Sequence, residues 1–381
     1  MLKAPEQRER DVRRLRMGMV GGGPGAFIGP IHRIAAELDR EIELAAGAFS
    51  SQAEKSTEAG VSYRIDPARA YPDVETMLRE EASREDGIDF VSVVSPNHHH
   101  FAATSAAISA GFPVISDKPM TATLEDAAKL AQLVEASGLP YGLTYTYSGY
   151  PLAREMRSRV ASGELGAIRK VVVEYPQGWL SQPAEGKQAE WRVDPDRAGA
   201  GGCIGDIGVH AFHLAEFVTG LKVTRILADL ASVVPGRALD DDCTVLLRFE
   251  NGARGVLLAS QIEIGELNGI RIRLYGDKAG MSWKQEEPNT LTIHRLDGRT
   301  ELIRSGDAQI GASVAASIRT PGGHPEGYLE AFANLYRDFA KQVRGEDGSL
   351  LPGAADGLRG MKFIDTAVRA SAAEAGWVDL G

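Results

Sequence analysis

An acid and two histidines occur at helical spacing in residues 201–214, GGCIGDIGVHAFHL. Asp206 and His210 are four positions apart and His213 follows three later, so an α-helix would place all three on one face. Beside them runs an apolar stripe that consists of Ile207, Ala211, Leu214 and Val218. A histidine next to a buried face can accept a proton near neutral pH, and an acid one turn earlier can accept its ring N–H. The alternative is a hydrated or internally satisfied Asp–His pair.

A lysine stands directly after the strand-like run FPVISD, in the segment SDKPM. Pro119 restricts the backbone of Lys118 to extended conformations, which would aim the side chain reproducibly. In an apolar cleft a lysine loses its proton readily or donates a strong hydrogen bond to a hydroxyl group. The alternative for an isolated Lys-Pro pair is a surface turn.

A glycine-rich turn, VGGGPGAFIGPIH, occupies residues 20–32 between the first predicted strand and the first predicted helix. In this position glycines let backbone N–H groups approach a pyrophosphate at a helix N-terminus. Gly21 and Gly23 fit the first two positions of G-x-G-x-x-G, but Gly29 comes later than the third glycine should. An ordinary turn is the alternative. The predicted dinucleotide contacts are Gly21, Gly23, Pro24, Gly25, Ala26, Phe27 and Ile28.

The loop after the second predicted strand, AFSSQAEK, carries Ser50 and Ser51 and no carboxylate before Glu54. An NAD site usually has an acid here that binds the ribose hydroxyls. The serines can hydrogen-bond a hydroxyl or a phosphate, and Lys55 favours a phosphate. The cofactor is therefore NAD or NADP, and an ordinary serine-rich loop is the alternative.

The third predicted strand ends in SPNHHH, a turn that would pass over a cofactor. Ser95, Pro96, Asn97 and His100 are the predicted contacts. Three consecutive histidines do not converge on one ion, and no cysteine or acid cluster accompanies them, so no metal site is predicted. A polar helix N-terminus is the alternative.

Strand-like and helix-like segments alternate through the first 145 residues. The patterns predict strands over 16–20, 42–49, 89–95, 112–117 and 140–145, with helices over 30–38 and 124–138 between them. Such alternation predicts βαβ units in a doubly wound parallel sheet. Ligands of these sheets bind at the carboxyl ends of the strands, where the glycine turn, SPNHHH and Lys118 would all lie.

From about residue 151 long strand-like runs dominate: 168–175, 223–234, 242–263 and 269–284. Asn251-Gly252 marks a hairpin, and the chain turns helical from about residue 326. We expect an α+β part with a mostly antiparallel sheet. The predicted organisation is a disordered or extended segment 1–16, a dinucleotide-binding domain 17–148, and a substrate-binding and oligomerisation domain 149–381.

The composition excludes several classes of protein. The 381 residues suit two domains, and the net charge of −10 argues against nucleic acid and anionic membranes as partners. Cys203 and Cys243 show no disulfide or zinc spacing, which fits a reducing compartment. Arg13-Arg14 precedes a stretch that glycines and prolines interrupt, so an export signal is disfavoured. No apolar run reaches membrane-spanning length, and a cytoplasmic location is expected.

Taken together, these motifs resemble those of the Gfo/Idh/MocA oxidoreductases. SPNHHH is similar to (T/S)-P-N-x-x-H, AGFPVISDKP to A-G-x-x-V-x-x-E-K-P, and DIGVH to D-x-G-x-H, and EWRVDPDRAGAGG also matches. The resemblance implies an N-terminal Rossmann domain and a larger C-terminal α/β domain with an open, mostly antiparallel sheet. It implies that Lys118, Asp206 and His210 form the catalytic set. Two features depart from the pattern: the glycine turn carries three extra residues, and Asp117 replaces a glutamate.

The function expected on this basis is NAD(P)-dependent oxidation of a secondary alcohol of a sugar or cyclic polyol. His210 would take the hydroxyl proton while the C–H hydride leaves for the nicotinamide. Asp206 would orient His210, and Lys118 would hydrogen-bond the reacting oxygen. Asp117 and Lys118 are also expected to contact the cofactor.

The substrate pocket is expected between the domains, where aromatic faces beside amides and acids suit a carbohydrate. No arginine cluster is evident, which disfavours a phosphorylated sugar. The GYP, DPDRAGAGG and GHPEGY segments are similar to the branch that oxidises anhydrosugars and glycosides such as levoglucosan. Candidate substrate contacts besides the catalytic set are Tyr147, Gln177, Trp179, Gln188, Trp191, Arg192, Asp194, His324, Glu326 and Tyr328.

Three other functions remain open. One is a lyase- or glycosidase-like enzyme that recycles its NAD, and another is an oxidoreductase that never releases its nucleotide. The third is a sugar- or nucleotide-sensing regulator without turnover, which would have no need of the Lys118, Asp206 and His210 set. The resemblance also implies a homodimer or homotetramer, because the open sheet must cover its free face.

Overall fold

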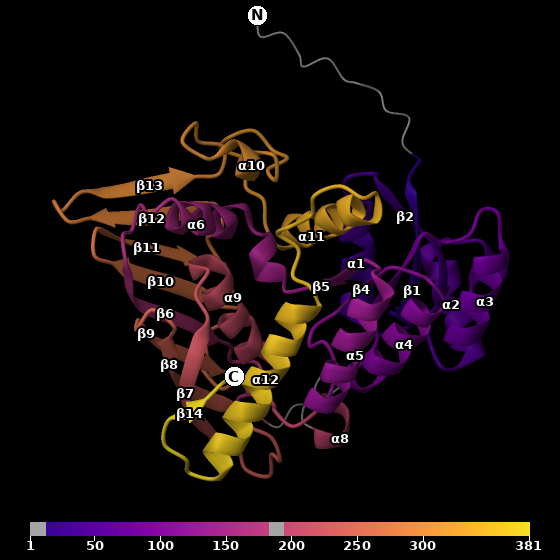
Figure 1. Ribbon diagram of the computed structural model, residues 1–381. Helices are drawn as coiled ribbons and strands as arrows, with labels where there is room; N and C mark the ends of the chain where they lie inside the picture. The colour runs from indigo at the N-terminus through magenta and orange to yellow at the C-terminus, as the bar shows by residue number, and fades with distance from the viewer. Residues whose placement is uncertain (1–12, 183–193) are drawn as a thin grey trace, which may run out of the picture.

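Two β-sheets lie beside each other with helices between them (Figure 1). The computed structural model describes residues 13–182 and 194–381. Most of the predicted N-terminal extension lies outside the described residues. Its last part is ordered, since the first strand begins at Leu15 and Arg13 pairs with Asp89 at 2.6 Å.

The N-terminal sheet is parallel, with the strand order β2-β1-β3-β4-β5. Its strands are almost wholly buried and rich in Val, Ile and Met, as expected of a sheet covered on both faces. The predicted doubly wound fold is confirmed. The strands are β1 (Leu15–Gly21), β2 (Ile42–Ala48), β3 (Phe90–Val94), β4 (Val114–Ser116) and β5 (Tyr141–Leu143).

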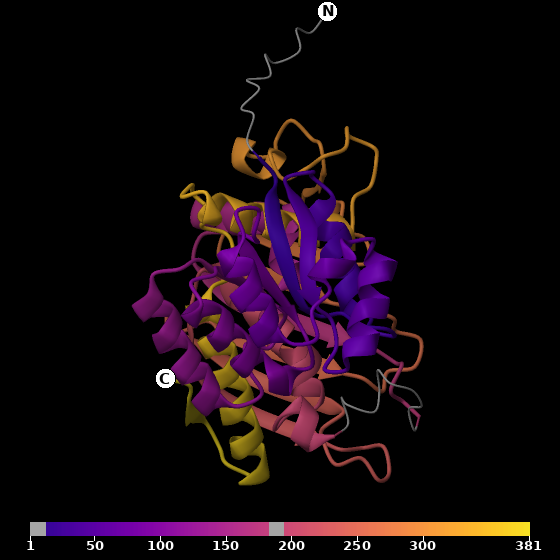
Figure 2. The same ribbon diagram turned by 90° about the vertical axis from the view of Figure 1, so that its right-hand side faces the viewer.

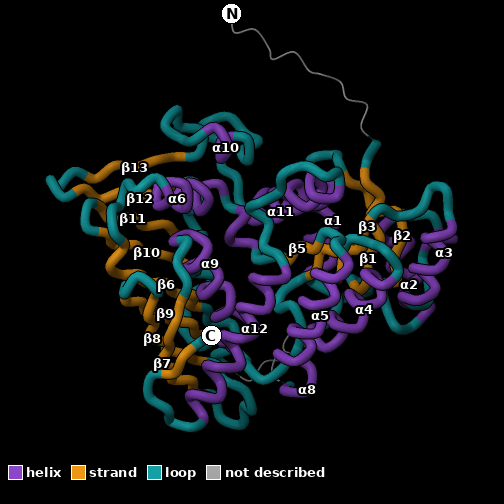
Figure 3. Tube along the Cα trace, in the orientation of Figure 1, coloured by secondary structure: helices purple, strands orange, loops and turns teal. Residues whose placement is uncertain are grey.

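Helices alternate with these strands along the chain (Figure 3). The predicted helix over 124–138 is α5: Thr123 accepts the N–H of Asp126 at its start, and Gly138 ends it with φ +66°. Because β1 pairs with both β2 and β3, the strand order reverses at β1, and a crevice opens at the carboxyl ends there. The helices are α1 (Ile28–Glu37), α2 (Ala53–Tyr63), η1 (Pro67–Arg69), α3 (Val74–Ser83), α4 (Asn97–Ser109), α5 (Leu124–Ser137) and η2 (Thr146–Gly149).

The second sheet contains nine of the described strands in the order β13-β12-β11-β10-β6-β9-β8-β7-β14. Every pair is antiparallel except β6 with β9. The predicted hairpin at Asn251-Gly252 joins β8 to β9, with Gly252 at φ +84°. The strands are β6 (Ile168–Pro176), β7 (Val223–Ala231), β8 (Asp242–Phe249), β9 (Arg254–Ser260), β10 (Arg271–Gly276), β11 (Ala279–Lys284), β12 (Thr290–Arg295), β13 (Thr300–Arg304) and β14 (Val378–Asp379).

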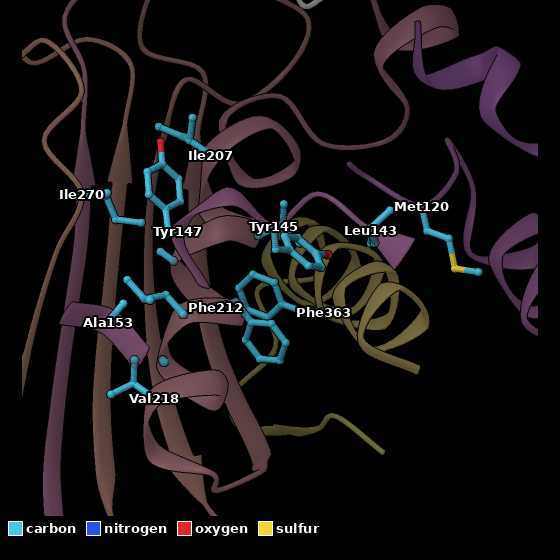
Figure 4. Close-up of a cluster of buried hydrophobic side chains, with 14 of the residues drawn as sticks. Met120, Leu143, Tyr145, Tyr147, Ala153, Ile207, Phe212, Val218, Ile270 and Phe363 are labelled. Carbon is cyan, nitrogen blue, oxygen red and sulfur yellow. The ribbon is translucent and has the colours of Figure 1, made fainter. Parts of the chain in front are cut away.

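Helices α6, α9 and α12 cover the face of this sheet that points toward the N-terminal domain (Figure 1). The core between them is aromatic: the rings of Phe212 on α9 and Phe363 on α12 stack 4.2 Å apart (Figure 4). The helical elements of this part are α6 (Pro151–Ala161), α8 (Pro195–Ala198), η3 (Ile204–Gly208), α9 (Val209–Thr219), α10 (Ala312–Ala315), α11 (Tyr328–Val343) and α12 (Ala354–Ala372).

The C-terminal segment returns to the N-terminal domain, which Figure 2 shows in front. Helix α11 packs against α1 and the parallel sheet, and the ring of Phe339 meets Phe90 of β3 edge to face at 5.1 Å. Phe332, Leu335 and Phe339 belong to the same buried cluster as Met17 and Met19 of β1. The sequence patterns grouped this helix with the second domain, but its apolar face completes the core of the first.

Among the described helices, none combines the length and the apolar character needed to cross a lipid bilayer.

Candidate active site

A cleft of about 1270 Å³ runs from the carboxyl ends of the parallel strands to η3 and β6. Ordinary small-molecule sites measure roughly 300–1,000 Å³, so this cleft has room for a dinucleotide and a small substrate together. The fold therefore gathers most of the predicted site residues in one place. Those that line the cleft are Gly21, Gly23, Pro24, Ala26, Phe27, Ile28, Ser50, Ser51, Ser95, Pro96, Asn97, Asp117, Lys118, Tyr147, Gln177, Trp179, Asp206, His210 and Tyr328.

The glycine turn accommodates its three extra residues without losing the close approach of α1 to β1. Gly21 and Gly22 adopt φ +92° and +80°, and a Cβ on Gly29 would lie 2.4 Å from Gly22 Cα. Gly29 thus provides the tight helix–strand packing that the third glycine provides in G-x-G-x-x-G. The extra residues extend into the cleft and leave Phe27 exposed, while Gly25 lies outside the lining.

Lys118 and Asp206 form a bonded pair at the centre of the cleft. The Lys118 ammonium donates to Asp206 Oδ1 at 3.0 Å and to the Asp206 backbone carbonyl at 2.6 Å. Gln261 Nε2 donates to the other carboxylate oxygen of Asp206 at 3.0 Å. Both charged side chains are about 15% exposed, so water screens their attraction only weakly.

The predicted continuous α-helix through Asp206 and His210 is wrong in its first turn. Residues Ile204–Gly208 form a π-helical turn, and α9 begins only at Val209. A π turn widens the backbone and re-aims the side chains on it, and such turns are frequent at functional sites. Here it directs the Asp206 carboxylate toward Lys118 and Gln261. The expected hydrogen bond from His210 to Asp206 is accordingly not formed.

His210 lies among three tyrosines, with ring centroids 5.0 Å from Tyr147, 5.7 Å from Tyr145 and 6.3 Å from Tyr175. No described residue offers a hydrogen-bond partner to its Nδ1. Burial, and then the charge of Lys118, lower the pKa of His210 well below its ordinary value. The imidazole is therefore neutral at pH 7, the form in which it can accept a proton.

His213, the third polar residue of the opening segment, belongs to the core. Its ring stacks on Tyr145 at 4.2 Å and lies 5.8 Å from Phe217. Burial lowers the pKa of His213 to about 4. It does not line the cleft. Both histidines lie on the regular helix α9, but only His210 lines the cleft.

Asp117 lies at the floor of the cleft, next to Lys118 in sequence, and Thr144 Oγ1 donates to its Oδ1 at 2.7 Å. Burial alone would raise the pKa of Asp117, but the interactions with His32 and Lys118 outweigh it and hold that pKa well below its usual range. The carboxylate is therefore ionised at neutral pH.

A network of phenols and amides forms the wall beside His210. Tyr147 and Tyr175 join their hydroxyls, Tyr175 donates to Asn268 Oδ1 at 2.7 Å, and Asn268 Nδ2 donates to the Tyr147 hydroxyl at 3.1 Å. Gln177 and Gln285 bond the same carboxamide at 2.9 and 3.3 Å. Burial raises the pKa of Tyr147 to about 12, so the phenol stays protonated. Such a rigid neutral wall suits a substrate rich in hydroxyls.

Of this wall, only Tyr147 and Gln177 were predicted from the sequence, and Tyr175, Asn268 and Gln285 were not. Asn268 lies in the loop between β9 and β10, and Gln285 directly follows β11. Neither position carries a local motif, so only strand pairing brings them to the cleft.

We expect Asn268→Asp to weaken polyol binding. A carboxylate cannot donate to Tyr147 or Gln285, and loss of buried hydrogen bonds costs about 1–3 kcal/mol. KM for the polyol that the protein oxidises should therefore rise about 5- to 150-fold, because 1.4 kcal/mol corresponds to a factor of ten. The Kd of NADH, measured by fluorescence titration of the same variant, should stay within error. An unchanged KM would show that the wall does not contact substrate.

The first turn of α4 lines the cleft through His98 and His99, and not through His100 as predicted. His98 and His99 face the cavity, whereas His100 is buried beneath it. The ring nitrogens of His100 lie 2.8 Å from the carbonyl oxygens of Ser95 and Pro119. Its role is therefore to tie two cleft loops together, and the predicted direct contact between His100 and the cofactor is not supported.

Several predicted substrate residues lie elsewhere. His324 is exposed in the loop before α11, with Nδ1 3.2 Å from the Pro321 carbonyl, and does not line the cleft. Glu326 is buried and accepts the N–H of Thr320 at 2.7 Å, a structural bond. Asp194 is also absent from the lining. The predicted residues Gln188, Trp191 and Arg192 fall outside the described residues.

The two cysteines meet although their spacing predicted no shared site. The sulfurs of Cys203 and Cys243 and a carboxylate oxygen of Asp240 lie within 4.8 Å of one another. Asp240 accepts the N–H groups of Gly202 and Ile204, each at 2.7 Å, and so fixes the start of η3. Burial raises the pKa of Cys203, which keeps its thiol protonated.

Two family models match the chain. One, described as "Oxidoreductase family, NAD-binding Rossmann fold", matches residues 15–145, and the other, "GFO/IDH/MocA C-terminal domain", matches residues 153–282. The chain belongs to the Gfo/Idh/MocA family. It is therefore an oxidoreductase with an NAD-binding Rossmann domain, which confirms the expected enzyme class and cofactor type.

Relatives of this Gfo/Idh/MocA protein match over almost its whole length. An uncharacterised oxidoreductase of Bacillus subtilis is 35% identical, over 96% of this chain and 97% of its own. The crystal structure of an inositol dehydrogenase homologue from Azotobacter vinelandii, complexed with NAD⁺, is 36% identical with a TM-score of 0.92, covering 96% of this chain and 97% of its own. Levoglucosan dehydrogenase of Pseudarthrobacter phenanthrenivorans is 25% identical over 97% of this chain and 99% of its own.

Proposed function

We propose that the protein is a dehydrogenase that oxidises a secondary alcohol of an unphosphorylated cyclic polyol or anhydrosugar with NAD(P). The observation that carries this proposal is the position of Lys118, Asp206 and His210. They meet in the cleft that the glycine turn enters, between the parallel sheet and the phenol–amide wall. A bound nicotinamide ring would supply the hydride acceptor.

The residues of the cleft can divide the proton chemistry between them. His210, neutral at pH 7, accepts the hydroxyl proton of the substrate as the C–H hydride leaves, and a ketone results. Lys118 donates a hydrogen bond to the same oxygen and stabilises its developing negative charge. Two oxygens of Asp206 hold the Lys118 ammonium. We therefore assign Asp206 the role of positioning Lys118, and not the role of orienting His210 that the sequence predicted.

The uncharged phenols and amides beside His210 support this substrate class. Among the described residues of the lining, the cationic side chains are Lys55, Lys118 and Arg197, and the Lys118 charge is already paired with Asp206. Amides and phenols replace the arginines that a phosphorylated sugar would need. The names of two relatives favour the same class, since one structure of the inositol dehydrogenase homologue holds NADH and myo-inositol and another relative is a levoglucosan dehydrogenase.

The test is the formation of NADH or NADPH by purified protein with a panel of inositols, anhydrosugars and simple sugars. We expect one of these unphosphorylated compounds to support turnover. Consumption of substrate without free NAD(P)H would favour an enzyme that recycles its nucleotide, and purification with nucleotide bound would favour one that never releases it. Binding of sugar without turnover would favour a regulator.

From the residues that follow β2 we expect both NAD and NADP to bind. Ser50, Ser51 and Lys55 line the cleft there, and no carboxylate from residues 49–53 would repel a 2′-phosphate. We expect Ser51→Asp to raise the Kd of NADP about tenfold or more while that of NAD stays or falls, since like charges repel in this partly enclosed site. Thr57→Asp, on the exposed side of α2 and outside the cleft, is the matched control. An equal loss for both nucleotides would contradict this assignment.

We also propose that the protein is a homodimer or homotetramer joined through the second sheet. On its outer face Val172, Leu246 and Val256 are neighbours on the adjacent strands β6, β8 and β9 and are only half-buried. Light scattering of the purified protein would test the oligomeric state.

The two free cysteines fit a cytoplasmic location.

A further inference from the structure

A chain of buried polar side chains runs from helix α11 to the floor of the cleft. The Tyr336 hydroxyl lies 2.8 Å from Ser92 Oγ and 2.7 Å from His32 Nδ1. On its other side, His32 Nε2 lies 3.7 Å from Asp117 Oδ1. Ser92, His32 and Tyr336 are shielded from solvent, so β3, α1 and α11 each place one polar group behind the cleft wall.

The direction of this chain follows from its donors and acceptors. Burial raises the pKa of Tyr336, so its hydroxyl keeps a proton to donate. When Ser92 donates to Tyr336 and Tyr336 donates to His32 Nδ1, both hydroxyls and Nδ1 have a partner, and His32 carries its own proton on Nε2. That N–H points at the Asp117 carboxylate and finds no hydrogen-bond partner among the described residues. A buried donor aimed at an anion attracts it across the gap.

Asp117 is the anion that this chain faces. It shares the cleft lining with the glycine turn and with Lys118, but the Lys118 ammonium is bonded to Asp206. The charge of Asp117 is thus stabilised by His32, by the nearby charge of Lys118 and by the hydroxyl of Thr144, while no described lysine or arginine bonds to it directly. An oxidised nicotinamide ring carries a positive charge and a reduced ring is neutral, so a buried anion in the cleft distinguishes the two.

We propose that Asp117 makes the cleft prefer the oxidised cofactor, and that His32, held by Tyr336, is the residue that positions the Asp117 carboxylate for this task. The inference rests on the proposed function only in that the cleft binds a nicotinamide dinucleotide. It extends that function, because the relative affinity for NAD⁺ and NADH determines the midpoint potential of the bound couple.

The experiment measures the Kd of NAD⁺ and of NADH separately, by titration without any sugar. Asp117→Asn removes the charge and keeps the size of the side chain, and we expect the ratio Kd(NAD⁺)/Kd(NADH) to rise about tenfold, as loss of a charge pair in a partly buried site predicts. A tenfold change in this ratio raises the midpoint potential of the bound two-electron couple by about 30 mV. Asp117→Glu, which restores the charge, should keep the ratio close to that of the parent.

The positioning role of His32 has its own variants. His32→Phe and Tyr336→Phe should raise the same ratio about two- to fivefold, less than Asp117→Asn, because the carboxylate remains but is less firmly held. Thermal unfolding of each variant reports whether it folds. Should Asp117→Asn not fold, Thr144→Val, which removes the other hydrogen bond to the carboxylate, is expected to raise the ratio as well.

The outcomes separate this inference from the proposed function. Failure of the parent to bind either nucleotide would contradict the proposed function itself. Binding of both forms with an unchanged ratio in Asp117→Asn would overturn the role of Asp117 alone. An equal loss of affinity for both forms in His32→Phe would assign His32 a purely structural role.

Discussion

Replacement of His210 by alanine is expected to lower kcat about 10²- to 10⁴-fold, the contribution typical of a positioned general base. His210 lies in the cleft beside the Lys118–Asp206 pair, and its lowered pKa keeps it ready to accept a proton. The Kd of NADH should change little, because the residue lies away from the glycine turn. Steady-state oxidation of the preferred polyol, together with nucleotide titration, measures both quantities.

His213→Phe is the matched control for this prediction. His213 lies one turn further along α9 but stacks on Tyr145 in the core, where a phenyl ring can replace it. This variant should keep kcat within a few-fold of the parent, as volume-conserving core substitutions usually do. If His213→Phe lost turnover and His210→Ala kept it, the two histidines would have to exchange roles.

The pH profile provides a second measure of the same group. Burial and the charge of Lys118 lower the pKa of His210, so its neutral form persists as the pH falls below the ordinary histidine value of about 6.5. Polyol oxidation should therefore decline only at a pH well below that value. A decline centred near the ordinary value would show that another, more exposed group titrates.

Gly29→Ala is expected to weaken nucleotide binding about 5- to 150-fold. The new Cβ would lie 2.4 Å from Gly22 Cα, which is backbone and cannot rotate away. Overpacking of this kind costs about 1–3 kcal/mol, and each 1.4 kcal/mol corresponds to a factor of ten in Kd. The glycine turn must then move away from α1, and its backbone N–H groups no longer point at the pyrophosphate. NADH titration and thermal unfolding would follow the effect.

Gly376→Ala serves as the control for the Gly29 variant. A Cβ at Gly376 would meet no atom within 4 Å, so neither binding nor stability should change appreciably. Normal nucleotide affinity in Gly29→Ala would mean that Gly22 and Gly29 can separate without cost, and the reading of Gly29 as the third glycine would be wrong.

Much of the cofactor half of the site was predictable from the sequence because its residues follow strands directly. Ser51, Ser95 and Lys118 each stand just beyond a strand of the parallel sheet, so their convergence depends only on strand order. The glycine turn was located for the same reason. The role of Gly29 was not evident, because the spacing of glycines in the sequence does not show how closely the backbones at Gly22 and Gly29 approach each other.

The substrate half was less predictable because it depends on packing between distant segments. The π turn at η3 begins where Gly202 and Ile204 bond the distant Asp240, whereas helical periodicity alone predicted an unbroken α-helix. Asn268 reaches the cleft only through the pairing of β9 and β10 with β6. His324 and Asp194 stand in segments that match the family's motifs, yet neither side chain lines the cleft.

The return of α11 to the parallel sheet bears on how the protein is made. The first 145 residues would emerge from the ribosome with the apolar face around Met17 and Phe90 uncovered, since Phe332 and Phe339 are synthesised almost 200 residues later. During synthesis the N-terminal domain therefore cannot complete its native core until α11 has been translated. During that interval the nascent chain exposes apolar surface that is prone to aggregation. Shortening the protein from its C-terminal end should accordingly reduce yield before it affects catalysis.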